Sequence, residues 1–123
     1  MSKSIKRIIK KNKNLTVSGR LWIECDGNRF FGPGPLELLE RIDTTGSING
    51  AAKEMKMSYK KAWEIINTLN EQSANPLVTT QTGGTKGGGS VISNEAKELI
   101  VYYRLLRERF KNFLEKETQK MGS

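Results

Sequence analysis

Apolar and polar residues alternate with a period of two between Leu15 and Cys25. The apolar residues that share one face of this stretch are Leu15, Val17, Leu21, Ile23 and Cys25. Such alternation predicts a strand with one buried face. Asp26 and Gly27 follow, and both tolerate the positive φ angles of a tight hairpin turn before a return strand begins at Phe30. We therefore expect a β-hairpin over residues 15–31.

Helical spacing of apolar residues replaces this alternation after Pro35, which fits the first turn of a helix that stops near Gly46. Ser47 and Ser58 then stand where each can cap the N-terminus of a further helix. The apolar residues of these two helices are Ile48, Ala51, Ala52 and Met55, then Ala62, Ile65, Ile66 and Leu69. Two helices joined by a turn of about three or four residues, with small residues where they cross, form a helix-turn-helix. This motif is expected over residues 47–70.

A second pair of strands is predicted directly after the second helix, over residues 77–82 and 91–93. The glycine-rich loop between them carries Lys86. A hairpin in this place, over residues 77–93, is typical of a wing, whose glycines allow a backbone to pass close to a phosphate while a lysine supplies charge. A hairpin without any partner would show the same pattern. The loop lacks the glycine-lysine-serine/threonine order of a P-loop, so nucleotide binding is not predicted.

The last predicted element is a long helix over residues 94–120. Its apolar positions are spaced alternately by three and four residues, at Ala96, Leu99, Tyr103, Leu106, Phe110 and Phe113. This spacing is that of a coiled-coil seam, although an amphipathic helix packed on its own domain gives the same stripe. We expect the chain to form a homodimer through this helix. The predicted dimerisation residues are Leu99, Tyr103, Leu106, Phe110 and Phe113.

Charge is distributed unevenly along the 123 residues, which are enough for a single domain. The net charge is +8, yet residues 1–14 hold six of the 21 basic residues and no acidic one, which leaves 15 basic residues against 13 acidic ones elsewhere. Residues 1–14 are therefore expected to form a basic N-terminal arm, either solvated or in contact with phosphates. Charge alone does not establish a nucleic-acid partner.

Several kinds of chemistry are excluded by composition. The chain has no histidine, which removes the usual general base and the commonest metal ligand. Cys25 is the only cysteine, so it can neither build a zinc site nor form an intramolecular disulfide. We expect no enzymatic activity, no catalytic residues, no metal and no cofactor. Without a membrane-length apolar run or an export signal, a cytoplasmic location is expected.

Five short motifs accompany the helix-turn-helix and its hairpin. They are Gly46-Ser-Ile48, Ala51-Ala-Lys53, Met57-Ser-Tyr-Lys-Lys-Ala-Trp63, Pro76-Leu-Val78 and Thr82-Gly-Gly-Thr-Lys-Gly-Gly-Gly89. Residues 46–90 thereby resemble the N-terminal DNA-binding domain of ModE-type molybdate-responsive regulators, which is similar in turn to that of LysR-type regulators. The resemblance implies a winged helix-turn-helix, a dimer through terminal helices, and a recognition helix that starts near Ser58.

One part of the family pattern is missing. In full-length ModE-type regulators the effector is bound by C-terminal oxyanion-binding modules, whereas this chain ends at Ser123. Molybdate or another oxyanion effector is therefore not expected. The predicted hairpin over residues 15–31 looks like that of short, stand-alone members of the family.

The sequence thus predicts an α+β fold, mainly α: an arm (1–14), a winged helix-turn-helix domain (15–93) and a dimerisation helix (94–120). The function expected is sequence-specific binding of double-stranded DNA and regulation of transcription. The expected DNA contacts are Ser47, Asn49, Lys53, Lys56, Ser58, Tyr59, Lys60, Lys61, Thr85 and Lys86. Trp63 is expected in the core. The alternatives are a winged-helix module that binds another protein and a sequence-independent DNA-binding protein.

Overall fold

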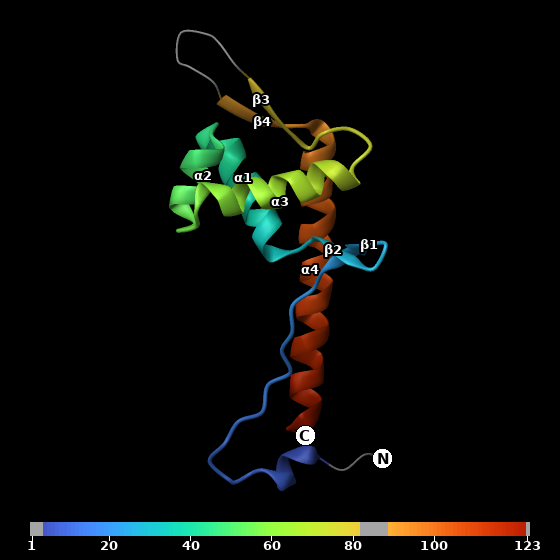
Figure 1. Cartoon of the computed structure of the whole chain (residues 1–123). Coiled ribbons are helices and arrows are strands. Elements are labelled where there is room, and N and C mark those ends of the chain that lie inside the picture. The colour runs from blue at the N-terminus through green and yellow to red at the C-terminus, as the bar shows by residue number, and fades with distance from the viewer. Residues whose placement is uncertain (1–3, 82–88, 123) are drawn as a thin grey trace.

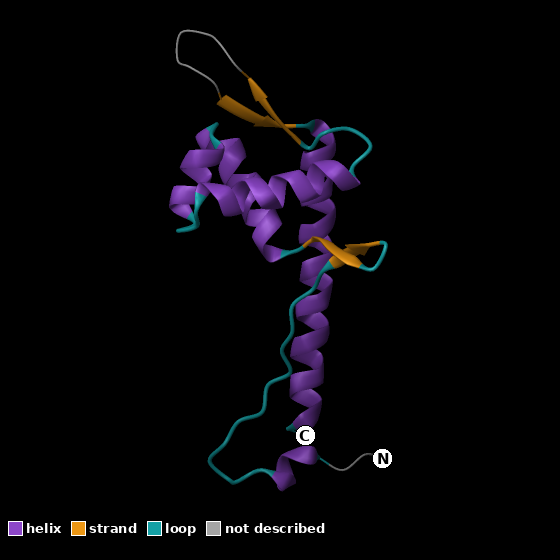
Figure 2. Cartoon of the chain, viewed as in Figure 1, coloured by secondary structure: helices purple, strands orange, loops and turns teal. Residues whose placement is uncertain are grey.

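The computed structural model of the chain describes residues 4–81 and 89–122. These residues form four α-helices and two antiparallel two-stranded sheets, shown in Figures 1 and 2. The helices are α1 (Pro33–Thr45), α2 (Ile48–Glu54), α3 (Tyr59–Gln72) and α4 (Asn94–Met121). The strands are β1 (Ile23–Cys25), β2 (Asn28–Phe31), β3 (Val78–Gln81) and β4 (Gly89–Ile92), and a 3-10 turn, η1 (Ile5–Ile8), precedes them. The predicted mixture of strands with a majority of helix is confirmed.

The N-terminal hairpin is shorter than the sequence predicts. Strands β1 and β2 pair only from Ile23 opposite Phe31 to Cys25 opposite Asn28. Residues 15–22 belong to no strand, and the Val17 N–H donates instead to the Thr118 Oγ1 of α4 at 2.9 Å. The predicted alternation of burial is nevertheless present: the apolar side chains are half-buried between exposed polar ones. The period-two pattern therefore arises from sheet pairing only at Ile23–Cys25, and before them from an extended segment that lies against α4.

Helices α1, α2 and α3 begin and end where the local chemistry predicts. Gly46 follows α1 with φ of 72°, a left-handed conformation that glycine adopts without strain. The Ser47 Oγ accepts a hydrogen bond from the Gly50 N–H at 2.9 Å, and the Ser58 Oγ accepts one from the Lys61 N–H at 3.0 Å. Both serines therefore cap their helices as predicted.

The core lies where α1, α2 and α3 meet the N-terminal half of α4. Ala51 and Ala52 of α2 are buried, and their small side chains allow α2 to approach its neighbours closely. Phe31 of β2 is fully buried and meets the Tyr103 ring of α4 edge-on, with the ring centroids 5.3 Å apart. The remaining core residues are Leu36, Leu38, Leu39, Ile42, Ile48, Ala62, Ile66, Leu69, Leu77, Val78, Ile92, Ala96 and Ile100.

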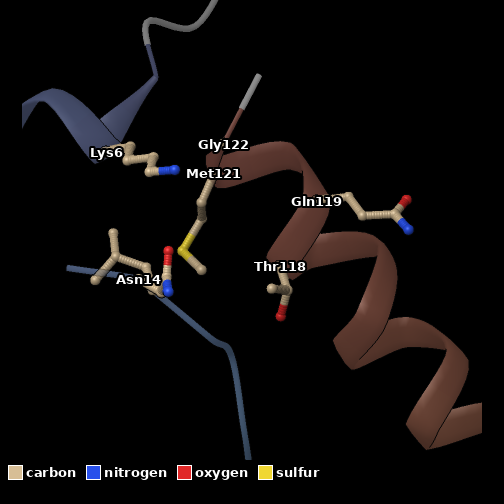
Figure 3. Close-up of a pocket in the computed structure, with 7 residues that line it drawn as sticks. Lys6, Asn14, Thr118, Gln119, Met121 and Gly122 are labelled. Atoms are coloured by element: carbon tan, nitrogen blue, oxygen red, sulfur yellow. The ribbon is translucent and has the colours of Figure 1, made fainter. Parts of the chain in front are cut away.

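Helix α4 extends well beyond the body of the protein, which is formed by α1, α2 and α3. The C-terminal half of α4 projects from that body (Figure 1). The described N-terminal segment runs along this projecting half, and its 3-10 turn η1 lies near the C-terminal end of α4. The Ser4 Oγ donates a hydrogen bond to the Met121 carbonyl oxygen at 2.6 Å. A shallow cavity of about 280 Å³ separates Lys6 and Asn14 from Thr118 and Met121 (Figure 3). The expected arm of residues 1–14 is thus, from Ser4 onward, placed beside α4.

The Tyr103 hydroxyl group offers a first test of this packing. It donates a hydrogen bond to the Leu21 carbonyl oxygen at 2.7 Å and so ties the N-terminal segment to α4. We expect Tyr103→Phe to lower the free energy of unfolding at neutral pH by about 1 kcal/mol, the typical net value of such a bond. Urea denaturation of both proteins measures the difference, and Tyr102→Phe, at a residue 57% exposed, is the matched control. Equal stability of Tyr103→Phe and the parent would show that the bond contributes nothing.

Because of the Tyr103 hydroxyl group, we also expect the stabilities of Tyr103→Phe and the parent chain to depend differently on pH in the alkaline range. Burial raises the pKa of Tyr103 above its usual value of 10.0, against a smaller opposing effect of the Arg107 charge. The folded chain therefore favours the neutral phenol. Stability from this group is present below pH 10.0 and is lost as the pH rises through the higher pKa of the folded state. Above pH 10.0, the free energy of unfolding should therefore fall less for Tyr103→Phe than for the parent chain.

Candidate nucleic-acid interface

The first turn of α3 presents a group of exposed polar and basic side chains. Ser58, Lys60 and Lys61 are exposed, and Tyr59 is 49% exposed. In Figure 1 this turn lies on the side of the body opposite α4. The turn is held in place because Ala62 and Ile66 are buried in the core below it. A rigid helix thus carries the side chains that the sequence assigns to DNA contact.

Three of the predicted contact residues meet around one cavity. Ser47 and Asn49 at the start of α2 and Tyr59 at the start of α3 line a hollow of about 360 Å³. Its remaining lining residues are Ile48, Trp63, Thr80, Gln81, Gly89 and Ser90. The helix starts and the β3–β4 hairpin therefore line one hollow of mixed polar and apolar character. Sequence reasoning missed the hairpin residues, because a strand pattern alone does not show which helix end the strand will reach.

Trp63 takes part in both the core and this surface. The sequence predicted a core position, whereas the side chain is half-buried: it packs against the core and also lines the cavity. The Tyr59 ring meets it edge-on, with centroids 6.1 Å apart and planes at 81°. This contact orients Tyr59, whose outer edge remains exposed beside the lysines.

The β3–β4 hairpin is anchored to the helices through polar contacts. The Asn70 Oδ1 accepts hydrogen bonds from the Leu77 N–H at 2.8 Å and the Val78 N–H at 3.2 Å, while its Nδ2 donates to the Val78 carbonyl oxygen at 3.1 Å. The Ser90 N–H donates to the Gly46 carbonyl oxygen at 2.9 Å. One amide of α3 and the turn before α2 thus determine where the hairpin lies. Sequence reasoning missed Asn70; its signal is a polar side chain beside the apolar face of a helix.

The electrostatics of this region favour an anionic partner. Residues 53–64 contain four lysines and two glutamates. Glu54 is neutralised by Arg41 of α1, with 2.8 Å between the Oε1 and Nη1 atoms. This hydrogen bond to Glu54 is the largest cause that raises the pKa of Arg41. The four lysines (Lys53, Lys56, Lys60 and Lys61) are exposed and have no ion pair within residues 4–81 and 89–122.

Two predicted contact residues, Thr85 and Lys86, lie outside the described residues. The charge that Lys86 was expected to supply to the wing thus also falls outside the described residues. The cavity and the four lysines involve only residues that the structure describes.

The predicted dimerisation residues are divided between the interior and the surface. Tyr103 is fully buried in its own chain, and Leu99 packs partly against the core. Phe110 lies against the N-terminal segment, since a Cβ at Gly19 would stand 3.3 Å from its Cζ. Phe113 is 54% exposed. Much of the predicted seam thus contacts residues of the same chain. The spacing by three and four residues also allows this arrangement, in which an amphipathic helix packs on its own domain.

A different face of α4 is both apolar and exposed. Val101, Tyr102 and Leu105 are each 56–57% exposed. Sequence reasoning missed these residues because they fall outside the three-and-four spacing that it followed. They are the part of α4 most available to a partner.

Other site types find no support in the described residues. These residues contain no group of three or more histidine, cysteine, aspartate or glutamate side chains that could hold a metal ion. No helix among them is long and apolar enough to cross a membrane. Cys25 is a half-buried thiol without a disulfide.

Three relatives show how the chain compares with known proteins. It is 32% identical over 103 residues to the molybdenum transport protein ModE of Azotobacter vinelandii, covering 84% of this chain and 38% of that protein. It is 42% identical over 88 residues to the DNA-binding transcriptional dual regulator ModE of Escherichia coli strain K12, covering 72% and 34%. It is 42% identical over 81 residues to the molybdenum-pterin-binding protein MopB of Rhodobacter capsulatus, covering 66% and 30%. No protein-family model matches the chain.

The chain spans about a third of the length of these relatives. Their names describe a transcriptional regulator and molybdenum-transport or molybdenum-binding proteins, and none of them describes an enzyme. The resemblance inferred from the motifs around the helix-turn-helix agrees with these alignments, which extend over two thirds or more of the chain's own residues in the first two cases. The chain is therefore a relative of the ModE-type regulators over most of its own length.

Proposed function

We propose that the chain binds double-stranded DNA in a sequence-specific manner, as a homodimer, and thereby regulates transcription. The observation that carries this proposal is the first turn of α3, where Lys60 and Lys61 stand exposed beside Tyr59 on a helix fixed by the core, without an ion pair to any residue that the structure describes. In this proposal α2 and α3 form the helix-turn-helix, and β3 and β4 form the base of the wing. Helix α3 lies in the major groove with its first turn nearest the bases.

Each polar group of the surface has a chemical role in this arrangement. Lys60 or Lys61 donates to guanine or to a phosphate, and Ser58 and Tyr59 contact either. The Ser58 Oγ accepts the capping hydrogen bond, which leaves its hydroxyl hydrogen available to donate to a phosphate oxygen. The same holds for Ser47 at the start of α2. The residues assigned to the DNA backbone are Ser47, Asn49, Lys53, Lys56, Thr85 and Lys86.

The domain organisation follows from the same proposal. Residues 15–93 form the DNA-binding domain, and the helix of residues 94–120 carries the dimer contact. The exposed residues Val101, Tyr102 and Leu105, which are neighbours on α4, support self-association through this helix, because adjacent exposed apolar side chains often mark an interaction surface; Phe113 is exposed as well.

Selection of bound duplexes from a random DNA pool, at near-physiological salt, tests the proposal. We expect enrichment of an inverted repeat whose half-sites are about one helical turn apart, as two symmetry-related recognition helices require. Recovery of DNA without a shared motif would instead indicate a sequence-independent binder with a steep salt dependence. Recovery of no DNA at all would contradict the proposal and favour a module that binds another protein.

A further inference from the structure

A second cavity, of about 530 Å³, lies between the β1–β2 hairpin, the start of α1 and α3. Its volume falls within the range of about 300–1,000 Å³ that is usual for small-molecule sites. Its apolar wall consists of Trp22, Phe30, Pro33, Pro35, Met57 and Ile65. Two aromatic side chains and two prolines thus contribute to an apolar wall for a ligand. None of the roles proposed above uses this wall.

The rim of the cavity is basic. Arg20, Arg29 and Lys61 line it together with one acidic residue, Glu64. The three cations are exposed and form no ion pair within the described parts of the chain. Three positive groups against one negative group leave an excess of positive charge above an apolar wall. An anion with an apolar body complements both features.

Two contacts hold the aromatic part of the site in place. The Arg29 guanidinium carbon lies 4.8 Å from the centroid of the Trp22 ring, a cation–π arrangement. On its other side the indole approaches Gly32 so closely that a Cβ there would stand 2.5 Å from the Trp22 Cδ2. The absence of a side chain at Gly32 therefore permits this position of Trp22. Preorganisation of this kind lowers the entropic cost of binding a ligand.

We propose that this cavity binds a small planar aromatic anion, a ring system that carries a carboxylate, a sulfonate or a phosphate. The rings lie against Phe30 and the edge of the Trp22 indole, whose two faces are covered by Arg29 and Gly32, and the anionic group accepts hydrogen bonds from Arg20 and Lys61. Because the ligand and a DNA phosphate compete for Lys61, occupation of the cavity lowers the affinity for DNA. This second consequence rests on the proposed function, whereas binding of the ligand does not.

Titration of the full chain with 2-naphthoate, followed by ¹H–¹⁵N NMR, tests the site in the absence of DNA. We expect saturable shifts centred on the indole N–H of Trp22 and the backbone of Phe30 and Lys61. The neutral analogue 2-naphthamide should bind at least about tenfold more weakly, since one charge-assisted hydrogen bond is worth about 1.5–3 kcal/mol. Hexanoate, an anion without rings, should also bind at least tenfold more weakly.

Substitutions locate the site. Arg20→Gln and Lys61→Gln should each weaken 2-naphthoate binding about tenfold, whereas Arg109→Gln, at an exposed arginine on α4, should leave it unchanged within twofold. Gly32→Ala should weaken binding by displacing the indole, and its NMR spectrum shows whether the fold persists. Equal affinity for the acid and the amide, equal effects of Arg20→Gln and Arg109→Gln, or no saturable shifts would each overturn the proposal.

The link to DNA is measured separately, on the duplex obtained by selection. We expect 2-naphthoate, at about three times its Kd for the parent chain, to weaken DNA binding of the parent clearly more than that of Arg20→Gln, whose cavity is then mostly empty because its Kd is about tenfold higher. Unchanged DNA affinity with the cavity occupied would overturn the competition for Lys61. Because the titration is performed without DNA, failure of the proposed DNA function leaves the result for the cavity readable.

Discussion

Replacing Lys60 and Lys61 together by alanine should weaken binding to the selected duplex by about two orders of magnitude. A side chain that reads a base contributes about 1–3 kcal/mol, a lost phosphate contact weakens binding to all sequences further, and a factor of ten corresponds to about 1.4 kcal/mol. Both side chains are exposed and form no ion pair within residues 4–81 and 89–122, so their loss should leave the fold intact. Fluorescence anisotropy of a labelled duplex at several salt concentrations measures the change.

The single variants separate two roles. A lysine that reads a base should, when replaced, relax the sequence preference, whereas one that contacts a phosphate should weaken all sequences alike and reduce the salt slope by about one. The matched control is Lys111→Ala combined with Lys116→Ala, which removes the same charge from exposed positions of α4. If the control weakened binding as much as the α3 variant, only long-range charge would be acting and the groove assignment would be wrong.

Asn70→Ala should lower the free energy of unfolding by about 3 kcal/mol, because it removes three hydrogen bonds and leaves buried backbone groups of Leu77 and Val78 without partners. These bonds hold the start of β3 against α3, so the variant should also bind DNA more weakly than its stability at the assay temperature explains. Chemical denaturation and the anisotropy assay measure the two effects.

Asn67→Ala is the matched control, since Asn67 lies one turn earlier on α3, is exposed and has no hydrogen bond from its side chain within the described residues. Its stability should remain within about 0.5 kcal/mol of the parent, as for most surface substitutions. Asn70→Asp keeps the acceptor for both N–H groups but loses the donor to Val78, so an intermediate loss is expected. A loss from Asn70→Ala no larger than that from Asn67→Ala would refute the anchoring role.

Local signals in the sequence predicted the helices well. Ser47, Ser58 and Gly46 act within one turn of their own positions, and the chemistry of caps and left-handed residues depends little on the rest of the fold. The apolar positions of α2 and α3 were equally readable, because helical spacing directly reports the face that is covered.

Patterns that show which residues are buried, but not which helix or strand buries them, were less informative. The alternation from Leu15 to Cys25 showed which side is covered but not that α4, instead of a strand, covers most of it. The spacing of α4 likewise allowed a partner helix or the chain itself, and Tyr103 proves to be buried by the chain itself. Such choices depend on contacts between residues about a hundred positions apart.

The candidate DNA-contact surface was likewise only partly predictable from the sequence. Its lysines were identified from sequence because they flank recognisable helix starts. The contribution of Thr80, Gln81 and Ser90 to the cavity was not, because it depends on where Asn70 and Gly46 place the hairpin. The position of Lys61 at the rim of a second cavity could not be inferred either, since that cavity is formed by the β1–β2 hairpin.

The pairing of the N-terminal segment with the far end of α4 constrains the order of events during synthesis. The partners of Ser4 and Val17 are Met121 and Thr118, which the ribosome adds more than a hundred residues later. At about 5–20 residues per second, this segment must wait several seconds for its binding site, with the exposed apolar side chains Ile5 and Ile8 in solvent. Six basic residues and no acidic one favour the hydration of residues 1–14, so this segment can remain in solvent until α4 is complete.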